Sequence, residues 1–234
     1  IGTYAATTTA TTTTTTTNWD SAAAQKRIND IGYVLIKKNN LPSGISLVVS
    51  SESEINAYSN INKQVYVYKG LLENVSSDEE LAAVIAHEIG HIINGHCAKQ
   101  TVLNAALSTV ANSVSTKNST AKTLGENLAV AKLSRTDEYE ADLTGVDLLQ
   151  KAGYNPLAMI SVLSKICGNY LDVLQSHPSG EKRLLNVYNY IDYNYNSVLK
   201  KGYNTDSYQK AIAIITPSVM KRNSSAKNIA KYEK

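Results

Sequence analysis

The sequence has no long hydrophobic run. Its most apolar stretches, residues 81–86 and 211–215, are only a few residues long. A helix needs ~20 consecutive apolar residues to cross a bilayer. A membrane-spanning helix is therefore excluded within this chain.

The sequence also lacks a strong excess of charge of either sign. It carries 23 Lys and Arg residues against 20 Asp and Glu residues, for a net charge of +3. The basic residues are scattered, whereas a nucleic-acid-binding surface gathers them in a patch or stripe. We therefore expect no nucleic-acid partner.

Cysteine is scarce. The two cysteines, Cys97 and Cys167, cannot build the framework of a disulfide-rich domain. Their separation matches neither a zinc ribbon nor a redox pair. We interpret them as small buried hydrophobic residues, with a single bridge between them as the alternative.

The length and composition fit one folded domain with an N-terminal appendage. A chain of 234 residues that is 43% hydrophobic can bury roughly 70% of its unfolded surface. Residues 7–17, by contrast, hold ten threonines and one alanine, and this tract offers nothing periodic to bury. We predict a flexible Thr-rich spacer over residues 1–18 and a single domain over residues 19–234. Such a spacer suits a domain tethered to a surface.

The chain begins at Ile1, without Met, and shows no apolar signal-peptide core. We therefore expect a processed or trimmed product, and this suggests an exported protein.

Hydrophobic periodicity predicts one helix and two strands in the first part of the domain. Asp20 or Ser21 can cap a helix that ends by residues 39–40. Two short β-branched runs, residues 45–49 and 65–68, then predict strands.

The remainder of the chain is predicted to be helical. From Ser77 onward the periodicity is that of helices, with breaks around Lys117, at residues 153–156 and at residues 177–180. The predicted fold class is α+β, mainly helical with a small β-sheet.

One predicted helix carries a metal-binding motif. Ser77 and Glu80 match a capping box at its start, and His87-Glu88-Ile89-Gly90-His91 follows within an apolar run. Two histidines four residues apart point the same way from a helix, so both can bind one zinc ion at ~2.0–2.1 Å. Glu88 is rotated about 100° from His87. It therefore lies beside the metal and suits a general base.

Two histidines leave zinc under-coordinated, so a third ligand must come from elsewhere. The metzincin pattern needs Gly and His where this chain has Asn94 and Cys97. His96 is rotated away from the face that carries His91. We interpret it as a residue at the C-terminal end of the helix that interacts with the helix dipole, rather than as a ligand. Gly95 is expected to loosen or end the helix.

The densest acidic cluster lies at residues 135–142. Glu138 and Asp142 share a helix face. Glu138 can therefore complete the metal site, while Asp142 accepts a hydrogen bond from the outer nitrogen of a ligand histidine. Glu140 is rotated about 200° from Glu138 and is expected to face solvent or Arg135. The alternative for the cluster is a solvated, charged helix face.

Three segments together resemble a known family. They are residues 86–91 with His96, residues 134–142 and residues 152–156. These segments resemble the CAAX-prenyl-protease and HtpX-like gluzincins of metallopeptidase family forty-eight, over roughly residues 56–183.

The resemblance implies a zincin-like domain whose small sheet lies beside the HExxH helix. It implies His87, His91 and Glu138 as the ligands of one zinc ion per chain, with Glu88 as the catalytic acid and base. Residues 56–58, followed by residues 65–72, look like the segment that forms the family's edge strand beside the active site.

His177-Pro178 and Arg183 are similar to the family's His-Pro and following Arg. His177 is expected to donate to the oxyanion or to occupy the open zinc position, with a loop-capping role as the alternative. Arg183 is expected to donate to the oxyanion or, like Asp142, to support the metal ligands from outside.

One departure indicates a branch of the family. The membrane-embedded members have spanning helices where this chain has residues 99–134, which are rich in Ser, Thr and Asn. The chain resembles the soluble, exported bacterial branch. This implies a place in the periplasm or cell envelope, with a lipid anchor or other envelope tether upstream of the domain.

These patterns predict a zinc endopeptidase that uses water activated by zinc and Glu88. We expect it to cleave unfolded or misassembled envelope proteins, bound as an extended strand along the sheet edge. The alternative is a latent or weakly active zinc protein that acts as a chaperone-like assembly factor. A peptidoglycan or small-peptide hydrolase is less favoured, because nothing resembles a wall-binding module.

Overall fold

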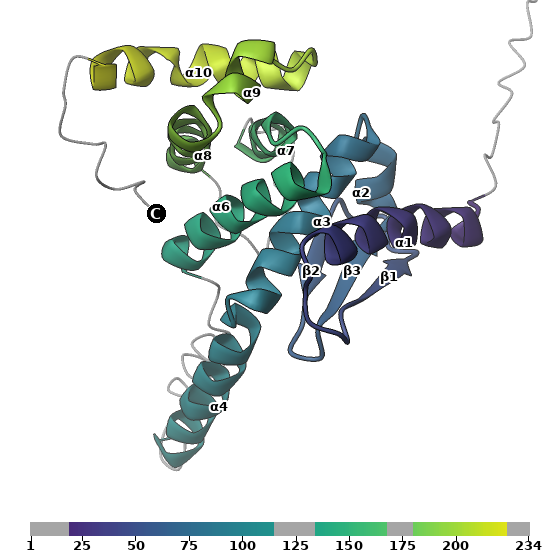
Figure 1. The fold of residues 1–234 in the computed structure, drawn as a ribbon. Coiled ribbons are helices and arrows are strands. Elements are labelled where there is room, and N and C mark those ends of the chain that lie inside the picture. The colour runs from purple at the N-terminus through teal and green to yellow at the C-terminus, as the bar shows by residue number, and fades with distance from the viewer. Residues whose placement is uncertain (1–18, 115–133, 168–179, 224–234) are drawn as a thin grey trace, which may run out of the picture.

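A computed structural model describes residues 19–114, 134–167 and 180–223 of the chain (Figure 1). The predicted spacer over residues 1–18, the predicted break around Lys117, and His177 all lie outside these described residues. The described part is mainly helical with one three-stranded sheet, which confirms the predicted α+β class.

The first helix, α1, spans Ser21–Lys38. Asp20 caps its start, because its carboxylate accepts a hydrogen bond of 2.9 Å from the backbone N–H of Ala23. Its buried face, which includes Ile28 and Leu35, packs against strand β1 and helix α3. The structure confirms both predicted ends of this helix to within a residue.

The sheet contains β1 (Ser46–Ser50), β2 (Ala57–Ser59) and β3 (Gln64–Tyr68), in the order β1-β3-β2. β1 runs parallel to β3 and β2 runs antiparallel to it. β2 is thus an edge strand, and it packs against α3. The structure confirms the strands predicted at residues 45–49 and 65–68 to within one residue.

Helix α2 (Lys69–Asn74) follows β3 and leads to the central helix α3 (Asp78–Ile93). Ser77 caps α3 by accepting from the N–H of Glu80. The predicted reciprocal half of the capping box is wrong, because the carboxylate of Glu80 instead accepts from the N–H of Ser76 at 2.7 Å. It also binds Ser161 and Lys165, so that it ties α3 to a later helix.

The remaining helices follow α3 in the chain, and α6 and α7 are the ones that make extensive contacts with it. They are α4 (His96–Val114), α6 (Arg135–Ala152), α7 (Leu157–Cys167), α8 (Glu181–Asn194), α9 (Asn196–Lys201) and α10 (Asp206–Asn223). Figure 1 shows α4 projecting away from the body, with α7 and α8 between α6 and α10. Gly153, in the left-handed conformation with φ 88°, ends α6 at the predicted break.

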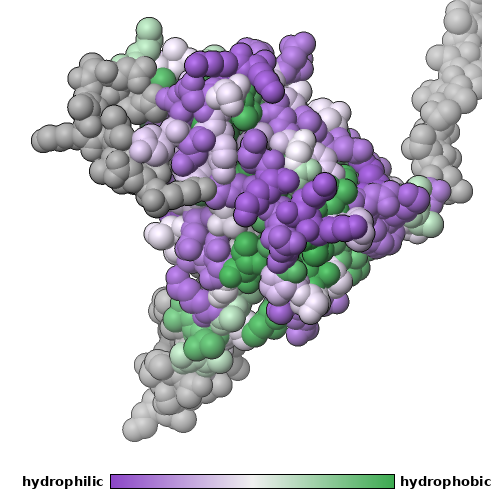
Figure 2. Space-filling model, in the orientation of Figure 1, coloured by the Kyte–Doolittle hydropathy of each residue, from purple (hydrophilic) through white to green (hydrophobic). Residues whose placement is uncertain are grey.

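The hydrophobic core surrounds α3, and every α3 residue from Glu80 to His91 is buried. Figure 2 shows a mainly hydrophilic surface over α9 and α10, with more hydrophobic atoms in the region of the sheet. Cys97 is a buried free thiol, as its preferred interpretation predicts. Among the described residues, no helix is long and apolar enough to span a membrane.

Candidate metal centre

The site forms where α3 and α6 cross at close range, and glycines allow this approach. A Cβ atom at Gly90 would lie 2.8 Å from the carbonyl oxygen of Ala141, and one at Gly145 would lie 3.2 Å from the backbone nitrogen of His87. Any larger residue would push the helices apart. The close crossing lets a side chain of α6 reach the histidines of α3.

Three side chains from these two helices converge on one point. His87 Nε2 and His91 Nε2 are 3.1 Å apart. Glu138 places Oε2 3.6 Å from His87 Nε2 and Oε1 3.5 Å from His91 Nε2. All three residues are buried. The HExxH spacing and the acid on the downstream helix are thus brought together as the sequence predicted.

This donor set fits a zinc ion. Two ligand atoms about 2.1 Å from a tetrahedral ion lie about 3.4 Å from each other. The two imidazole nitrogens are 3.1 Å apart, and each lies 3.5–3.6 Å from one of the two carboxylate oxygens of Glu138, which is close to that value. Two imidazoles and one carboxylate also match the ligand types that zinc prefers. Since three ligands leave a tetrahedral ion one open position, the arrangement suits a catalytic rather than a closed structural site.

Glu88 follows His87 directly in α3 and is not one of the three converging residues. It is buried, with 1% of its surface exposed, and Ser59 Oγ at the end of the edge strand donates to its Oε2 at 3.0 Å. The thiol of Cys97 lies 3.5 Å from Ser59 Oγ. Burial, together with the charge of Glu88, raises the pKa of this thiol.

Asp142 and Arg183 form a charged cluster that contacts His87 and Glu138. Asp142 Oδ1 lies 2.9 Å from His87 Nδ1. Arg183, at the start of α8, donates two hydrogen bonds of 2.8 and 2.7 Å to Asp142, and its Nη1 lies 2.9 Å from Glu138 Oε2. Burial alone would raise the pKa of Asp142, but Arg183 and His87 outweigh this effect and lower the pKa to about 2.

These contacts separate the two roles expected of Arg183. The guanidinium is buried against both carboxylates, so its contacts favour the hypothesis that Arg183 supports the ligands from outside. Asp142 lies where the sequence predicted it, next to the outer nitrogen of a histidine of the site.

The predictions for His96 and Glu140 were wrong in part. His96 begins α4 rather than ending α3, and its Nδ1 lies 2.9 Å from the outer nitrogen of His91. The reason is Gly95, whose φ of 76° turns the chain back toward the site. The carboxylate of Glu140 is exposed, as expected, but it contacts His96 Nε2 at 3.3 Å.

Sequence reasoning missed Ser59 and the placement of His96. For Ser59, the available signal was its position directly after the edge-strand segment of residues 56–58. For His96, the signal was the glycine before it, which prevents the helical rotation from continuing past Asn94.

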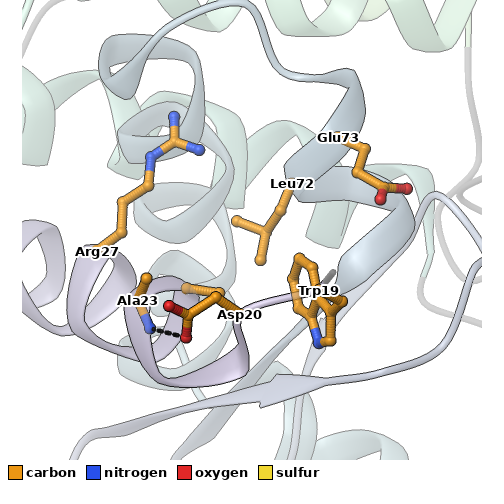
Figure 3. A pocket seen from close by; sticks show the side chains of 7 residues that line it. Trp19, Asp20, Ala23, Arg27, Leu72 and Glu73 are labelled. Atoms are coloured by element: carbon orange, nitrogen blue, oxygen red, sulfur yellow. Dashed lines mark hydrogen bonds between the residues drawn. The ribbon is translucent and has the colours of Figure 1, made fainter. Parts of the chain in front are cut away.

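A separate hollow of about 300 Å³ lies at the start of α1 (Figure 3). Trp19, Asp20 and Arg27 line it together with Leu72 and Glu73 near the end of α2. None of the three residues of the metal centre lines this hollow, so it belongs to a different part of the surface.

Comparison with known families gives the fold and site a context. The profile of Peptidase family M48 matches residues 22–191, which run from the second residue of α1 into α8 and include His87, His91 and Glu138. The chain belongs to peptidase family M48. The resemblance seen in the motifs is thereby confirmed.

Several curated proteases are similar to this chain. The mitochondrial metalloendopeptidase OMA1 of Arabidopsis thaliana is 36% identical over 149 residues, which are 60% of this chain and 30% of the relative. The beta-barrel assembly-enhancing protease of Yersinia pestis is 27% identical over 69% of this chain and 38% of its own length. The metalloprotease LoiP of Escherichia coli is 29% identical over 61% of each. The chain therefore spans between about a third and three fifths of these relatives.

Proposed function

We propose that this M48 member is a zinc-dependent endopeptidase. The observation that carries the proposal is the convergence of His87, His91 and Glu138, together with the buried carboxylate of Glu88, the residue next to His87 in α3. A purely structural zinc site has no use for an additional buried carboxylate at its margin. The protease names of the relatives support the same reaction class.

The proposed chemistry divides between the metal and the chain. His87, His91 and Glu138 would hold one zinc ion per chain, which would supply a Lewis acid and lower the pKa of a nearby water. Glu88 takes the proton from the attacking water and gives it to the leaving amine. Ser59 orients Glu88 through the hydrogen bond to Oε2. Asp142 and Arg183 hold His87 and Glu138 in place.

We propose that the substrate is a protein or peptide bound as an extended strand along β2. β2 is at the edge of the sheet, and Ser59 at its end contacts Glu88. A peptide paired with this edge would pass the proposed general base. Main-chain pairing gives affinity without requiring one particular sequence. This suits unfolded or misassembled protein segments.

The location and domain plan complete the proposal. We propose an exported protein of the periplasm or cell envelope, with residues 19–234 as the peptidase domain and residues 1–18 as a spacer to an envelope tether. The names of the relatives described as beta-barrel assembly-enhancing proteases support a role in the quality control of envelope proteins.

Profiling of cleavage on a mixture of unfolded proteins tests this function. The zinc-loaded chain should cut many sequences, the chelated chain should cut none, and added zinc should restore cutting. Cleavage that persists after chelation would contradict the proposal. Zinc-dependent binding of unfolded chains without cleavage would instead favour the chaperone-like alternative.

A further inference from the structure

The two histidines of the metal centre have different outer partners. The Nδ1 atom of His87 faces a carboxylate, that of Asp142, as ligand histidines commonly do. The Nδ1 atom of His91 faces a second imidazole, that of His96, at 2.9 Å. The mechanism proposed above gives His96 no role, although it is buried with only 3% of its surface exposed.

Zinc binding determines the direction of the hydrogen bond between His91 and His96. A neutral imidazole carries one proton, so His91 can offer Nε2 to a metal only when the proton is on Nδ1. That N–H must then donate to His96, which accepts at Nδ1. The proton of His96 is consequently on Nε2.

The groups around His96 match this arrangement. Its Nε2 lies 3.3 Å from Glu140 Oε2 and 3.8 Å from Asp137 Oδ1, and both of these groups accept hydrogen bonds when ionised. Asp137 is itself held by Lys99 at 2.8 Å and by Ser134. The carboxylates of α6 thus favour a His96 that is protonated on the outer nitrogen.

The position of the His96 imidazole follows from the turn of the backbone at Gly95. His96 is the first residue of α4, immediately after the left-handed turn at Gly95. Its ring therefore lies between α3, which supplies His91, and α6, which supplies Asp137 and Glu140. The hydrogen bonds run from the metal centre through His96 to the exposed carboxylate of Glu140.

We propose that His96 is a positioning residue for zinc: its Nδ1 accepts the outer N–H of His91 and so keeps His91 Nε2 directed at the metal. This inference rests on the proposed function, because it needs zinc at His87, His91 and Glu138. It assigns to His91 the kind of outer support that Asp142 gives to His87.

Two substitutions at the same position test the role. His96→Asn retains an acceptor near the position of Nδ1, whereas His96→Leu fills the space without one. Outer partners of ligand histidines contribute about 10- to 100-fold to metal affinity. We expect zinc affinity, measured by chelator competition, to fall by that factor in His96→Leu and to stay within about threefold of the parent in His96→Asn.

A spectroscopic measurement separates this role from a merely structural one. In the zinc-loaded parent and in His96→Asn, nitrogen-15 NMR of the histidine rings should show His91 with its proton on Nδ1 and slow exchange of that proton with water. In His96→Leu the exchange should be faster. Thermal melting of the metal-free variants shows whether each one folds.

The results of these measurements distinguish a failure of the role proposed for His96 from a failure of the proposed zinc peptidase function. Parent-like affinity and slow exchange in a folded His96→Leu would overturn the role of His96, and so would equal losses of affinity in the two variants. Failure of the unsubstituted chain to bind zinc would instead overturn the proposed function. That result is visible before any variant is made.

Discussion

At the scale of single residues, the site balances buried charges. Glu138 and Asp142 are both fully buried carboxylates, and Arg183 is the guanidinium that contacts both. A buried charge needs a partner of opposite sign. A bound cation would supply further positive charge next to Glu138 and so add to the charge balance of the site.

Glu138 and Glu140 form a matched pair for testing the ligand set. Both are glutamates of α6, but only Glu138 approaches both histidines of the centre. Glu138→Ala should lose most bound zinc after dialysis. Glu140→Ala should keep it with at most about a threefold loss of affinity, because Asp137 remains near His96. Elemental analysis provides the measurement, and equal zinc in Glu138→Ala and the parent would move the third ligand elsewhere.

His177 lies outside the described residues. Whether peptidase activity rises or falls in His177→Ala tests the role of this residue. His177→Ala should lower peptidase activity if the imidazole donates to the oxyanion, and should raise it if the imidazole blocks the site at rest. We expect an increase. Peptidase assays at equal zinc content check this, and unchanged activity would return His177 to a loop-capping role.

At the scale of helices and strands, Glu80 connects α3 to α7. Its fully buried carboxylate accepts from Ser161 at 2.7 Å and from Lys165 at 2.7 Å. Burial alone would raise the pKa of Glu80, but the hydrogen bonds from Lys165, Ser76 and Ser161 together outweigh it and lower the pKa below 4.5.

Lys165→Met should therefore destabilise the fold by about 2 kcal/mol at neutral pH, because it leaves Glu80 buried without its cation. The folded pKa of Glu80 is lowered, so its contribution to stability is present above pH 4.5 and is lost as pH falls through the folded value. Urea unfolding at neutral pH and at about pH 3.5 checks this. The gap between parent and variant should narrow in acid, and a constant gap would contradict the assignment.

The elements with strong local signals could be predicted from the sequence. Apolar periodicity and the Asp20 cap place α1, and β-branched runs place β1 and β3. The HExxH spacing places two donors of the site, because a single helix fixes their geometry.

The features that depend on tertiary contacts could not be predicted in this way. Glu80 binds α7 rather than completing a capping box, since Ser161 and Lys165 are distant in sequence. His96 returns to the site because Gly95 takes a positive φ, and Glu140 meets it only because α6 crosses α3. The rotation predicted for His96 assumed that the helix continues past residue 94, but α3 ends at Ile93.

At the scale of the whole molecule, the metal centre joins α3 to α6 through the middle of the fold. These two helices form the most extensive helix pair among the described residues. Their crossing brings His87 and His91 from one helix against Glu138 from the other. A bound ion therefore links two halves of the core, and its removal should weaken the entire domain.

Metal removal should lower the melting temperature. Free zinc at 100 times its dissociation constant adds about 2.7 kcal/mol, which corresponds to roughly 5–10 °C for a domain of this size. Differential scanning calorimetry with zinc, with chelator and with zinc restored should show a reversible shift of that order. Glu138→Ala should show no such shift, and a parent insensitive to zinc would contradict the proposed centre.

The proposed zinc peptidase depends on Glu88 as its general base. The most direct test compares casein cleavage by the zinc-loaded parent and by Glu88→Gln at equal zinc content. Glu88→Gln should keep one zinc per chain, because Glu88 is not among the three converging ligands. It should lose turnover by about 10²- to 10⁴-fold, the usual contribution of a positioned base. Cleavage by Glu88→Gln at the parental rate, with zinc retained, would contradict the account.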